Sequence, residues 1–171
     1  DTHFYGCVGN DIFGESLKRN LELNNVSSHI REIAGVSSGT ALIAVDNTDN
    51  IITVVPGANA YLSDADIPES VDGKDILLCQ LEIDQKIVRE FFRRGRIAGA
   101  TNIFNPSPFA ALEQNILEMV DIVIVNQTEL LGLCELMGIQ SADKKLEDVL
   151  QEIQSRKNFR AIIVTLGSNG V

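Results

Sequence analysis

Short runs of β-branched and aliphatic residues alternate along most of the chain with longer segments of helical apolar spacing. Short apolar runs predict strands, and an apolar period of three to four residues predicts helices. The predicted strands are 2–8, 75–81, 100–104, 122–125 and one that begins near 160. The predicted helices are 11–25, 84–98, 110–119, 127–137 and 144–155. This alternation predicts an α/β fold, with a mainly parallel sheet covered on both faces in a three-layer α/β/α arrangement.

Residues 36–56 depart from this alternation. Two strand-like runs, 38–46 and 50–55, are joined by Asn47-Thr48-Asp49-Asn50, which is turn-forming chemistry. The pattern predicts an antiparallel β-hairpin that ends at Pro56. A lone two-stranded hairpin is marginally stable in water, so we expect it to lie against a ligand or another copy of the chain.

Composition and charge narrow the function. The 171 residues carry 24 acidic and 14 basic side chains, a formal net charge of −10. Such a surface disfavours nucleic acids and anionic membranes as partners. It would also repel a nucleotide at long range, so any nucleotide site must depend on local backbone amides and a metal ion. No apolar run has membrane-spanning length and no signal-peptide pattern is visible, so we expect a cytoplasmic protein.

Three cysteines, Cys7, Cys79 and Cys134, stand apart from one another in or beside apolar runs. This odd, unclustered set predicts buried reduced thiols rather than a disulfide framework or a zinc site. The ends of the chain suggest an incomplete domain. The first strand is already under way at Thr2, and Val171 should open the next strand. We therefore expect a fragment of a larger protein.

Polar residues follow four of the predicted strands. In a parallel sheet they share the carboxyl edge, where open α/β sheets bind ligands. The four clusters are Gln80-Leu81-Glu82, Asn105-Pro106, Asn126 with Glu129, and Thr165-Leu-Gly-Ser-Asn-Gly170.

Each cluster also has a purely structural interpretation. Asn126 and Glu129 fit a variant of the capping box at a helix start. Gly167 and Gly170 fit a tight turn, or a loop whose amides approach a phosphate. Glu82 could be an acid near a helix N-terminus or a hydrogen-bond acceptor for a hydroxylated ligand. The basic cluster Arg89, Arg93, Arg94 and Arg96 is interpreted as a solvated helix face.

The order and spacing of these clusters resemble the ribokinase-like sugar kinases, also called the phosphofructokinase-B type. The resemblance covers almost the whole chain, and Asn-x-x-Glu followed by Thr-x-Gly-x-x-Gly is its fairly specific part. The other motifs that carry it are Val8-Gly-Asn-Asp-Ile-Phe-Gly14, Gly39-Thr40-Ala41, Pro56-Gly-Ala-Asn-Ala60, Gln80-Leu81-Glu82 and Asn105-Pro106.

The resemblance implies a role for several residues. Glu82 matches a sugar-contacting position, and the hairpin, 36–56, matches a lid over the sugar that also pairs subunits into a homodimer. Sugar contacts from the lid are expected at Thr40 and Ala41. Glu129 matches the acid that organises Mg²⁺ and phosphate. ATP-binding positions are implied at Asn126, Thr165, Gly167 and Gly170.

No catalytic residue is implied within this chain. The family's general-base Asp, adenine pocket and potassium site should follow Val171, and its sugar-binding first strand should precede Asp1. The resemblance thus implies a partial kinase domain, residues 1–171, that is inactive alone.

For the full-length protein the resemblance implies ATP-dependent phosphorylation of a sugar hydroxyl, with the 5-hydroxyl of D-ribose as the expected acceptor. Fructokinase, adenosine or other nucleoside kinase and ketodeoxygluconate kinase remain alternatives within the family. A non-catalytic sugar- or nucleotide-binding protein of the same fold also remains open. A dinucleotide-binding oxidoreductase is disfavoured, because no Gly-x-Gly-x-x-Gly follows the first strand.

Overall fold

The computed structural model describes residues 1–45, 50–109 and 112–171. The chain forms two compact units, Asp1–Pro68 and Glu69–Val171. Each unit has its own sheet and its own core.

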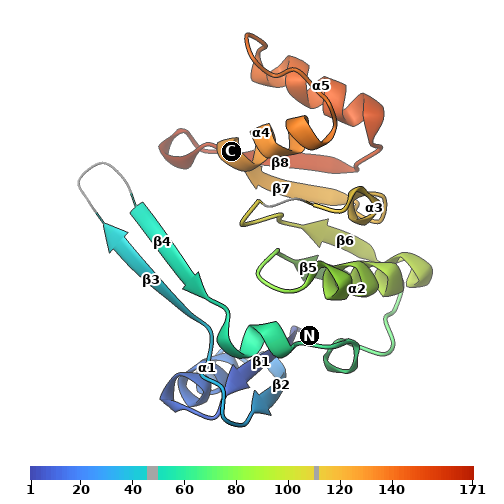
Figure 1. Ribbon diagram of the computed structural model, residues 1–171. Helices are drawn as coiled ribbons and strands as arrows, with labels where there is room; N and C mark the ends of the chain where they lie inside the picture. The colour runs from blue at the N-terminus through green and yellow to red at the C-terminus, as the bar shows by residue number, and fades with distance from the viewer. Residues whose placement is uncertain (46–49, 110–111) are drawn as a thin grey trace. The chain divides into compact units, whose positions relative to one another are not determined.

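The first unit opens with a parallel strand–helix–strand motif. Strand β1 (His3–Gly9) pairs with β2 (Ser27–Ile33), and α1 (Ile12–Leu23) connects them (Figure 1). Asp11 is the N-cap of α1, because its Oδ1 accepts the Gly14 amide at 2.8 Å. The sequence did not predict β2. Its residues are mostly polar and exposed, so no apolar run marks it.

Two short 3₁₀ turns complete the core of this unit. They are η1 (Gly57–Tyr61) and η2 (Asp64–Asp66). Ala58 of η1 packs with Cys7 and Ile33. The Arg31 guanidinium binds both carboxylate oxygens of Asp66, at 2.6 and 2.8 Å.

The predicted hairpin is confirmed as an antiparallel pair. Strand β3 (Thr40–Val45) pairs with β4 (Asn50–Val55), with Thr40 opposite Val55 and Ile43 opposite Ile52. The predicted turn residues 47–49 lie outside the described residues. Both faces of the hairpin expose apolar side chains, namely Leu42, Ile43, Val45, Ile51, Ile52, Val54 and Val55.

The second unit contains a parallel four-stranded sheet in the order β5-β6-β7-β8. The strands are β5 (Ile76–Cys79), β6 (Thr101–Phe104), β7 (Ile122–Asn126) and β8 (Ala161–Thr165). The helices are α2 (Gln85–Ala98), α3 (Gln114–Leu117), α4 (Gln127–Leu136) and α5 (Leu146–Arg156). The parallel sheet predicted from the continuous apolar strands is confirmed.

One predicted helix is shorter than expected. Of residues 110–119, only Gln114–Leu117 is helical, and residues 110 and 111 lie outside the described part. Leu112 is buried in the core without being helical. Leu112 therefore contributes to core packing rather than to a helix.

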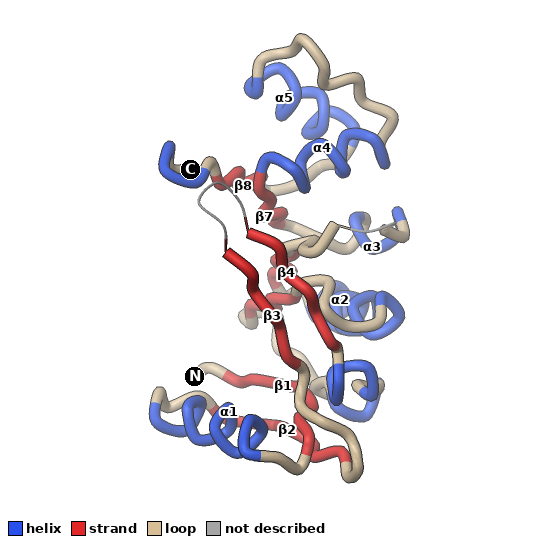
Figure 2. Tube along the Cα trace, turned by 60° about the vertical axis from the view of Figure 1, so that its left-hand side comes forward, coloured by secondary structure: helices blue, strands red, loops and turns tan. Residues whose placement is uncertain are grey.

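The helices of this unit pack on one face of its sheet. Val88, Phe92, Ile116, Leu133 and Ile153 of α2–α5 form one core with inward strand residues such as Phe104, Val123 and Val164. Right-handed crossovers between strands added in one direction place every connecting helix on the same side, as Figure 2 shows.

The opposite sheet face also bears apolar side chains. Ile76 and Leu78 are 68% and 64% exposed. Strand register aligns them with the half-buried Ile103, Ile122, Ile124 and Ile163.

Candidate functional site

The polar clusters predicted at four strand ends do share one edge of the second unit's sheet. All four strands are parallel, so Gln80–Glu82, Asn105, Asn126 and Thr165 follow strands that end at the same side. Asn126 and Thr165 are direct register partners across β7 and β8. The tertiary structure therefore brings together residues from four separate segments of the chain.

Asn126 and Glu129 form a complete capping box at the start of α4. The Glu129 amide donates to Asn126 Oδ1 at 2.8 Å, and the Asn126 amide donates to Glu129 Oε2 at 2.8 Å. The capping interpretation is thus confirmed. Glu129 is nevertheless only 6% exposed. Since carboxylates are seldom buried without a partner, this is an unusual place for a residue that only caps a helix.

Asn105 connects the capping box to the neighbouring strand. Its Nδ2 donates to the Ile124 carbonyl at 2.8 Å and lies 3.5 Å from Glu129 Oε2. The Asn105 amide donates to the Cys79 carbonyl at 2.9 Å. Sequence reasoning placed Asn105 at this edge, but it did not predict the contact with Glu129. The only signal was an Asn directly after a strand and before a Pro.

Glu82 extends from the end of β5 and is exposed. The N-cap of α2 is Asp84, whose Oδ1 accepts the Lys86 amide at 2.8 Å, so Glu82 is not the capping acid. The Glu82 amide donates to Gln80 Oε1 at 2.6 Å. Within the described residues its carboxylate makes no hydrogen bond or ion pair and can accept hydrogen bonds from a ligand.

The environment of the neighbouring Cys79 thiol disfavours a role as a nucleophile. Burial raises the pKa of its thiol to about 11, and the thiol donates to the Gln80 carbonyl at 3.3 Å. A thiol with so high a pKa stays protonated near neutral pH and is therefore unreactive.

The segment after β8 is a tight turn. It contains η3 (Gly167–Asn169), and the Leu166 amide donates to the Gly170 carbonyl at 2.8 Å. Gly167 and Gly170 have φ values of +60° and +89°, which favour glycine. The exposed Thr165 precedes the turn, with Oγ1 3.5 Å from the Val125 carbonyl. Val171 is not part of a strand, contrary to expectation.

Thr40 and Ala41 belong to the first unit. Both are exposed on β3, opposite Val55 and Val54 of β4.

The carboxyl edge of the β5–β8 sheet, which we call the site edge, contains few acidic residues. In the described part of the chain, no three His, Cys, Asp or Glu side chains are grouped as a metal centre would require. Mg²⁺ often binds through one or two carboxylates, with waters and substrate phosphates completing its shell. One buried carboxylate beside amide donors fits that kind of site and does not fit a cage built from protein ligands alone.

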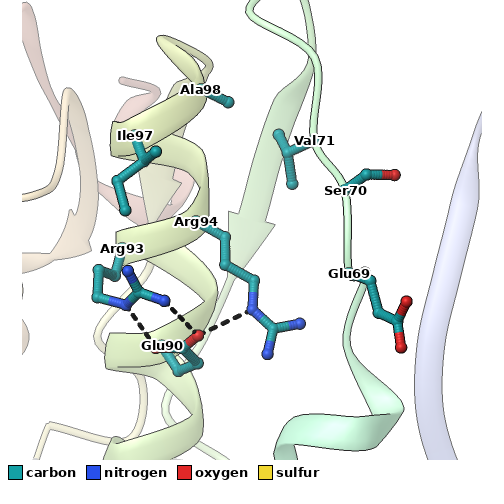
Figure 3. Close-up of a pocket in the computed structure, with 8 residues that line it drawn as sticks. All are labelled: Glu69, Ser70, Val71, Glu90, Arg93, Arg94, Ile97 and Ala98. Atoms are coloured by element: carbon teal, nitrogen blue, oxygen red, sulfur yellow. Dashed lines mark hydrogen bonds and ion pairs between the residues drawn. The ribbon is translucent and has the colours of Figure 1, made fainter.

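A separate cleft lies along the C-terminal half of α2, away from the strand ends. Figure 3 shows Arg93 and Arg94 both bound to Glu90. The two guanidinium groups hold the pKa of Glu90 at about 2. The cleft is lined by Glu69, Ser70, Val71, Glu90, Arg93, Arg94, Ile97 and Ala98.

The other arginines of this helix also have acidic partners. Arg89 pairs with Glu113 and Arg96 with Asp121. These ion pairs agree with the solvated-face interpretation of the cluster.

Comparison with known proteins gives one family. The sequence profile described as "pfkB family carbohydrate kinase" matches residues 1–171. Ribokinase of Haemophilus influenzae is 28% identical over 174 residues, with 98% of this chain and 56% of the relative covered. Deoxyribokinase of Salmonella typhi is 30% identical over 174 residues, with 95% and 54% covered.

Solved structures agree with this result. Ribokinase of Thermotoga maritima superposes with a TM-score of 0.76 at 28% identity, covering 96% of this chain and 54% of that one. The chain thus has a ribokinase-like fold and spans about half the length of the relatives it matches. No helix among the described residues is long and apolar enough to cross a membrane.

Proposed function

Because the chain belongs to the pfkB family of carbohydrate kinases, we propose that the complete protein transfers a phosphoryl group from ATP to a sugar hydroxyl. One observation carries the proposal within the structure. The buried Glu129 carboxylate lies at the carboxyl edge of a parallel sheet, where its Oε2 accepts the Asn126 amide and lies 3.5 Å from the Asn105 side-chain nitrogen.

Glu129 is proposed to organise Mg²⁺ and the phosphates of ATP. Its observed hydrogen bonds converge on Oε2 and hold the carboxylate in place. Oε1 makes no hydrogen bond with the described residues, so it can accept one from a metal-bound water. Bound Mg²⁺ would neutralise charge on the transferring group, which is the main requirement of phosphoryl transfer.

Asn126, Thr165, Gly167 and Gly170 are proposed to bind the ATP phosphates. The exposed Thr165 hydroxyl and the glycine turn sit at the strand edge beside Asn126. No Cβ blocks approach at Gly167 or Gly170, where the surrounding space is open. Hydroxyl and amide donors here can bind phosphate oxygens although the chain as a whole is acidic.

Glu82 is proposed to accept hydrogen bonds from sugar hydroxyls. Sugar contacts from Thr40 and Ala41 of the hairpin are a separate proposal, which rests on the family alone. The exposed, unpaired carboxylate of Glu82 supports this role. Residues 36–56 would act as a lid that excludes water and so limits wasteful ATP hydrolysis. The exposed apolar side chains of the hairpin also support a homodimer formed through it.

No residue of this chain is assigned as general base. We propose that an Asp beyond Val171 has that role and that residues 1–171 alone are inactive. A monovalent cation such as K⁺ would also bind outside this chain. The free cysteines Cys7, Cys79 and Cys134 agree with the reducing cytoplasm as its location.

D-Ribose, phosphorylated at its 5-hydroxyl, is the acceptor we propose. The second candidate is 2-deoxyribose, because the deoxyribokinase relative is 30% identical and a ribokinase relative 28%. A difference this small does not separate two sugars that differ by one hydroxyl. Fructose and adenosine are the remaining candidates within the family.

The test is a coupled assay of ADP release by the complete protein with Mg²⁺ and ATP. Ribose, 2-deoxyribose, fructose and adenosine are compared, and the product is identified by ³¹P NMR. We expect the highest kcat/KM with ribose and a 5-phosphate product. Higher kcat/KM with another acceptor would reject ribose. Ligand binding without turnover of any acceptor would instead indicate a non-catalytic binding protein.

A further inference from the structure

Asn105 contacts two neighbouring elements of the site edge through one side-chain amide. It follows β6, and its Nδ2 donates to the Ile124 carbonyl of β7 at 2.8 Å. The same nitrogen lies 3.5 Å from Oε2 of Glu129 on α4. Both partners are acceptors, so the NH₂ group rather than the amide oxygen must face them.

The contact with Glu129 is long for a hydrogen bond, and the Asn105 amide that makes it is held by its shorter bond to the Ile124 carbonyl. The strong bond to Ile124 fixes the Asn105 amide, and its second N–H is then available to Glu129. The Asn126 amide donates to the same Oε2 at 2.8 Å. Two donors from different strands therefore converge on one oxygen of this buried carboxylate.

The residues after Asn105 are held on two further sides. We call Asn105–Phe109 the bridging segment. Its Ser107 carbonyl accepts the Leu81 amide at 3.0 Å, beside Glu82. Its Phe109 ring packs over Gly132 of α4, where a Cβ would stand 2.4 Å from ring atom Cδ1. Pro106, between Asn105 and Ser107, is fully buried. The segment thus contacts both the end of β5 and the helix that carries Glu129.

We propose that Asn105 is a positioning residue for Glu129, and that the bridging segment holds the acceptor-binding end of β5 in register with the metal-organising carboxylate. This inference rests on the proposed function, in which Glu129 organises Mg²⁺ and Glu82 contacts the sugar. Asn105 itself need not touch substrate or metal. Its effect is to keep the Glu129 carboxylate oriented before ligands bind.

The first test measures the Mg²⁺ dependence of the complete protein carrying Asn105→Leu, whose side chain branches at the same atom but is larger and has no donor. We expect the Mg²⁺ concentration for half-maximal rate to rise about tenfold, as is typical when a group that orients a metal-organising residue is removed. Asn105→Ser is the substitute if the Leu variant does not fold. An unchanged Mg²⁺ dependence in a folded variant would overturn the proposal.

Asn105→Asp gives a second, independent signature. A carboxylate at this position would face Glu129 at close range, and like charges raise the pKa of one member of such a pair. We expect the acid limb of the pH–rate profile to move up by about one pH unit. A profile that stays in place would contradict contact between the two side chains.

Asn102→Ala is the matched control. Asn102 lies on β6, which Asn105 follows, and its Nδ2 donates to the Phe92 and Met119 carbonyls at 2.8 Å rather than to Glu129. Its loss should lower the melting temperature with little change in Mg²⁺ dependence. An equal Mg²⁺ effect in this control would show that the Asn105 effect is only structural.

A measurement that does not depend on catalytic turnover can test the role of Asn105 separately from the proposed kinase activity. Hydrogen exchange of the Asn126 amide reports its bond to Glu129 Oε2 directly. We expect Asn105→Leu to speed this exchange about tenfold even if no sugar is phosphorylated. If Glu129→Gln alters Mg²⁺ dependence but Asn105→Leu changes neither property, the inference fails and the proposed function stands.

Discussion

Glu129 shows that one side chain can cap a helix and also belong to a ligand site. Its Oε2 closes the capping box with the Asn126 amide at 2.8 Å, which is a local and purely structural bond. The same oxygen lies 3.5 Å from the side-chain nitrogen of Asn105, which follows β6. A cap needs only the first bond. The second bond and the burial are what connect this residue to a site.

Substitution of Glu129 separates the two roles. In the complete protein, Glu129→Ala should lower kcat at least a hundredfold, whereas loss of the cap should cost about 1 kcal/mol of stability. Steady-state kinetics over a range of Mg²⁺ concentrations and a thermal melt measure the two effects. Normal turnover and Mg²⁺ dependence combined with an early melt would mean that Glu129 is only a cap.

Glu82 differs from Glu129 because it has no structural bond to lose. Its carboxylate is exposed and unpaired within the described residues. Glu82→Ala should therefore raise KM for the sugar about tenfold and leave KM for ATP and the melting temperature nearly unchanged. Equal changes in both Michaelis constants would argue against a sugar contact.

At the scale of single elements, α2 shows how tertiary packing overrides helix propensity. Gly95 is buried in this helix, and a Cβ there would stand 2.1 Å from Asn102 Oδ1 and 2.9 Å from Leu77. Asn102 is itself fully buried, and its Oδ1 has no hydrogen-bond partner in the described structure. Close approach of helix and strand here requires glycine.

Gly95→Ala tests this packing. In an exposed helix the change would stabilise by about 1 kcal/mol, but here the steric conflict should destabilise the protein by about 2 kcal/mol. Chemical denaturation of the complete protein measures the sign. Lys86→Ala, at an exposed position of the same helix, is the control for propensity alone. A more stable Gly95→Ala variant would show that the strand and helix separate easily.

The hairpin is a two-stranded element that is marginally stable by itself, so we expect a second copy of the chain to pack against it. Register places Ala41, Ile43, Val45, Ile52 and Val54 on one face of β3 and β4. Ile43→Asp on that face should raise the dissociation constant of a homodimer at least tenfold. Sedimentation equilibrium of the complete protein measures this constant. Thr53→Asp on the opposite face is the control. A dimer unaffected by Ile43→Asp would place the interface elsewhere.

At the scale of the whole molecule, the parallel sheet of the second unit has one apolar face that is still exposed. Helices α2–α5 cover one face, while Ile76 and Leu78 on the other remain mostly exposed. Parallel sheets are normally buried on both sides. This agrees with a chain that spans about half the length of its relatives.

Each of the two units contains a carboxylate whose lowered pKa makes the folded state less stable in acid. Asp66 in the first unit and Glu90 in the second each have a pKa lowered to about 2, chiefly by hydrogen bonds from Arg31 and from Arg93 with Arg94. A lowered pKa stabilises the folded state above the ordinary pKa of about 4, and this gain is lost as pH falls from there towards 2.

We expect Asp66→Asn and Glu90→Gln each to cost about 1 kcal/mol at pH 7 and almost nothing at pH 2, because solvent screens both pairs. Denaturation curves across this pH range provide the measurement. A constant loss at every pH would show that these carboxylates act through packing rather than charge.

The sequence by itself determined the elements with strong periodicity and the residues at strand ends. Continuous apolar runs predicted β5–β8, and the Asn126–Glu129 spacing predicted the cap, because these signals depend on neighbours along the chain. Polar β2 was missed, and the helix around α3 was predicted too long, because their formation depends on pairing and burial rather than on local pattern.

Only the tertiary structure decided which polar groups meet. Strand order and parallel register bring Asn105 to Glu129 across 24 positions in sequence, and Thr165 beside Asn126 across β7 and β8. It also decided that the helices cover one sheet face. The physical reason is that hydrogen bonds between strands and the handedness of crossovers act between segments far apart in the chain, where no local pattern records them.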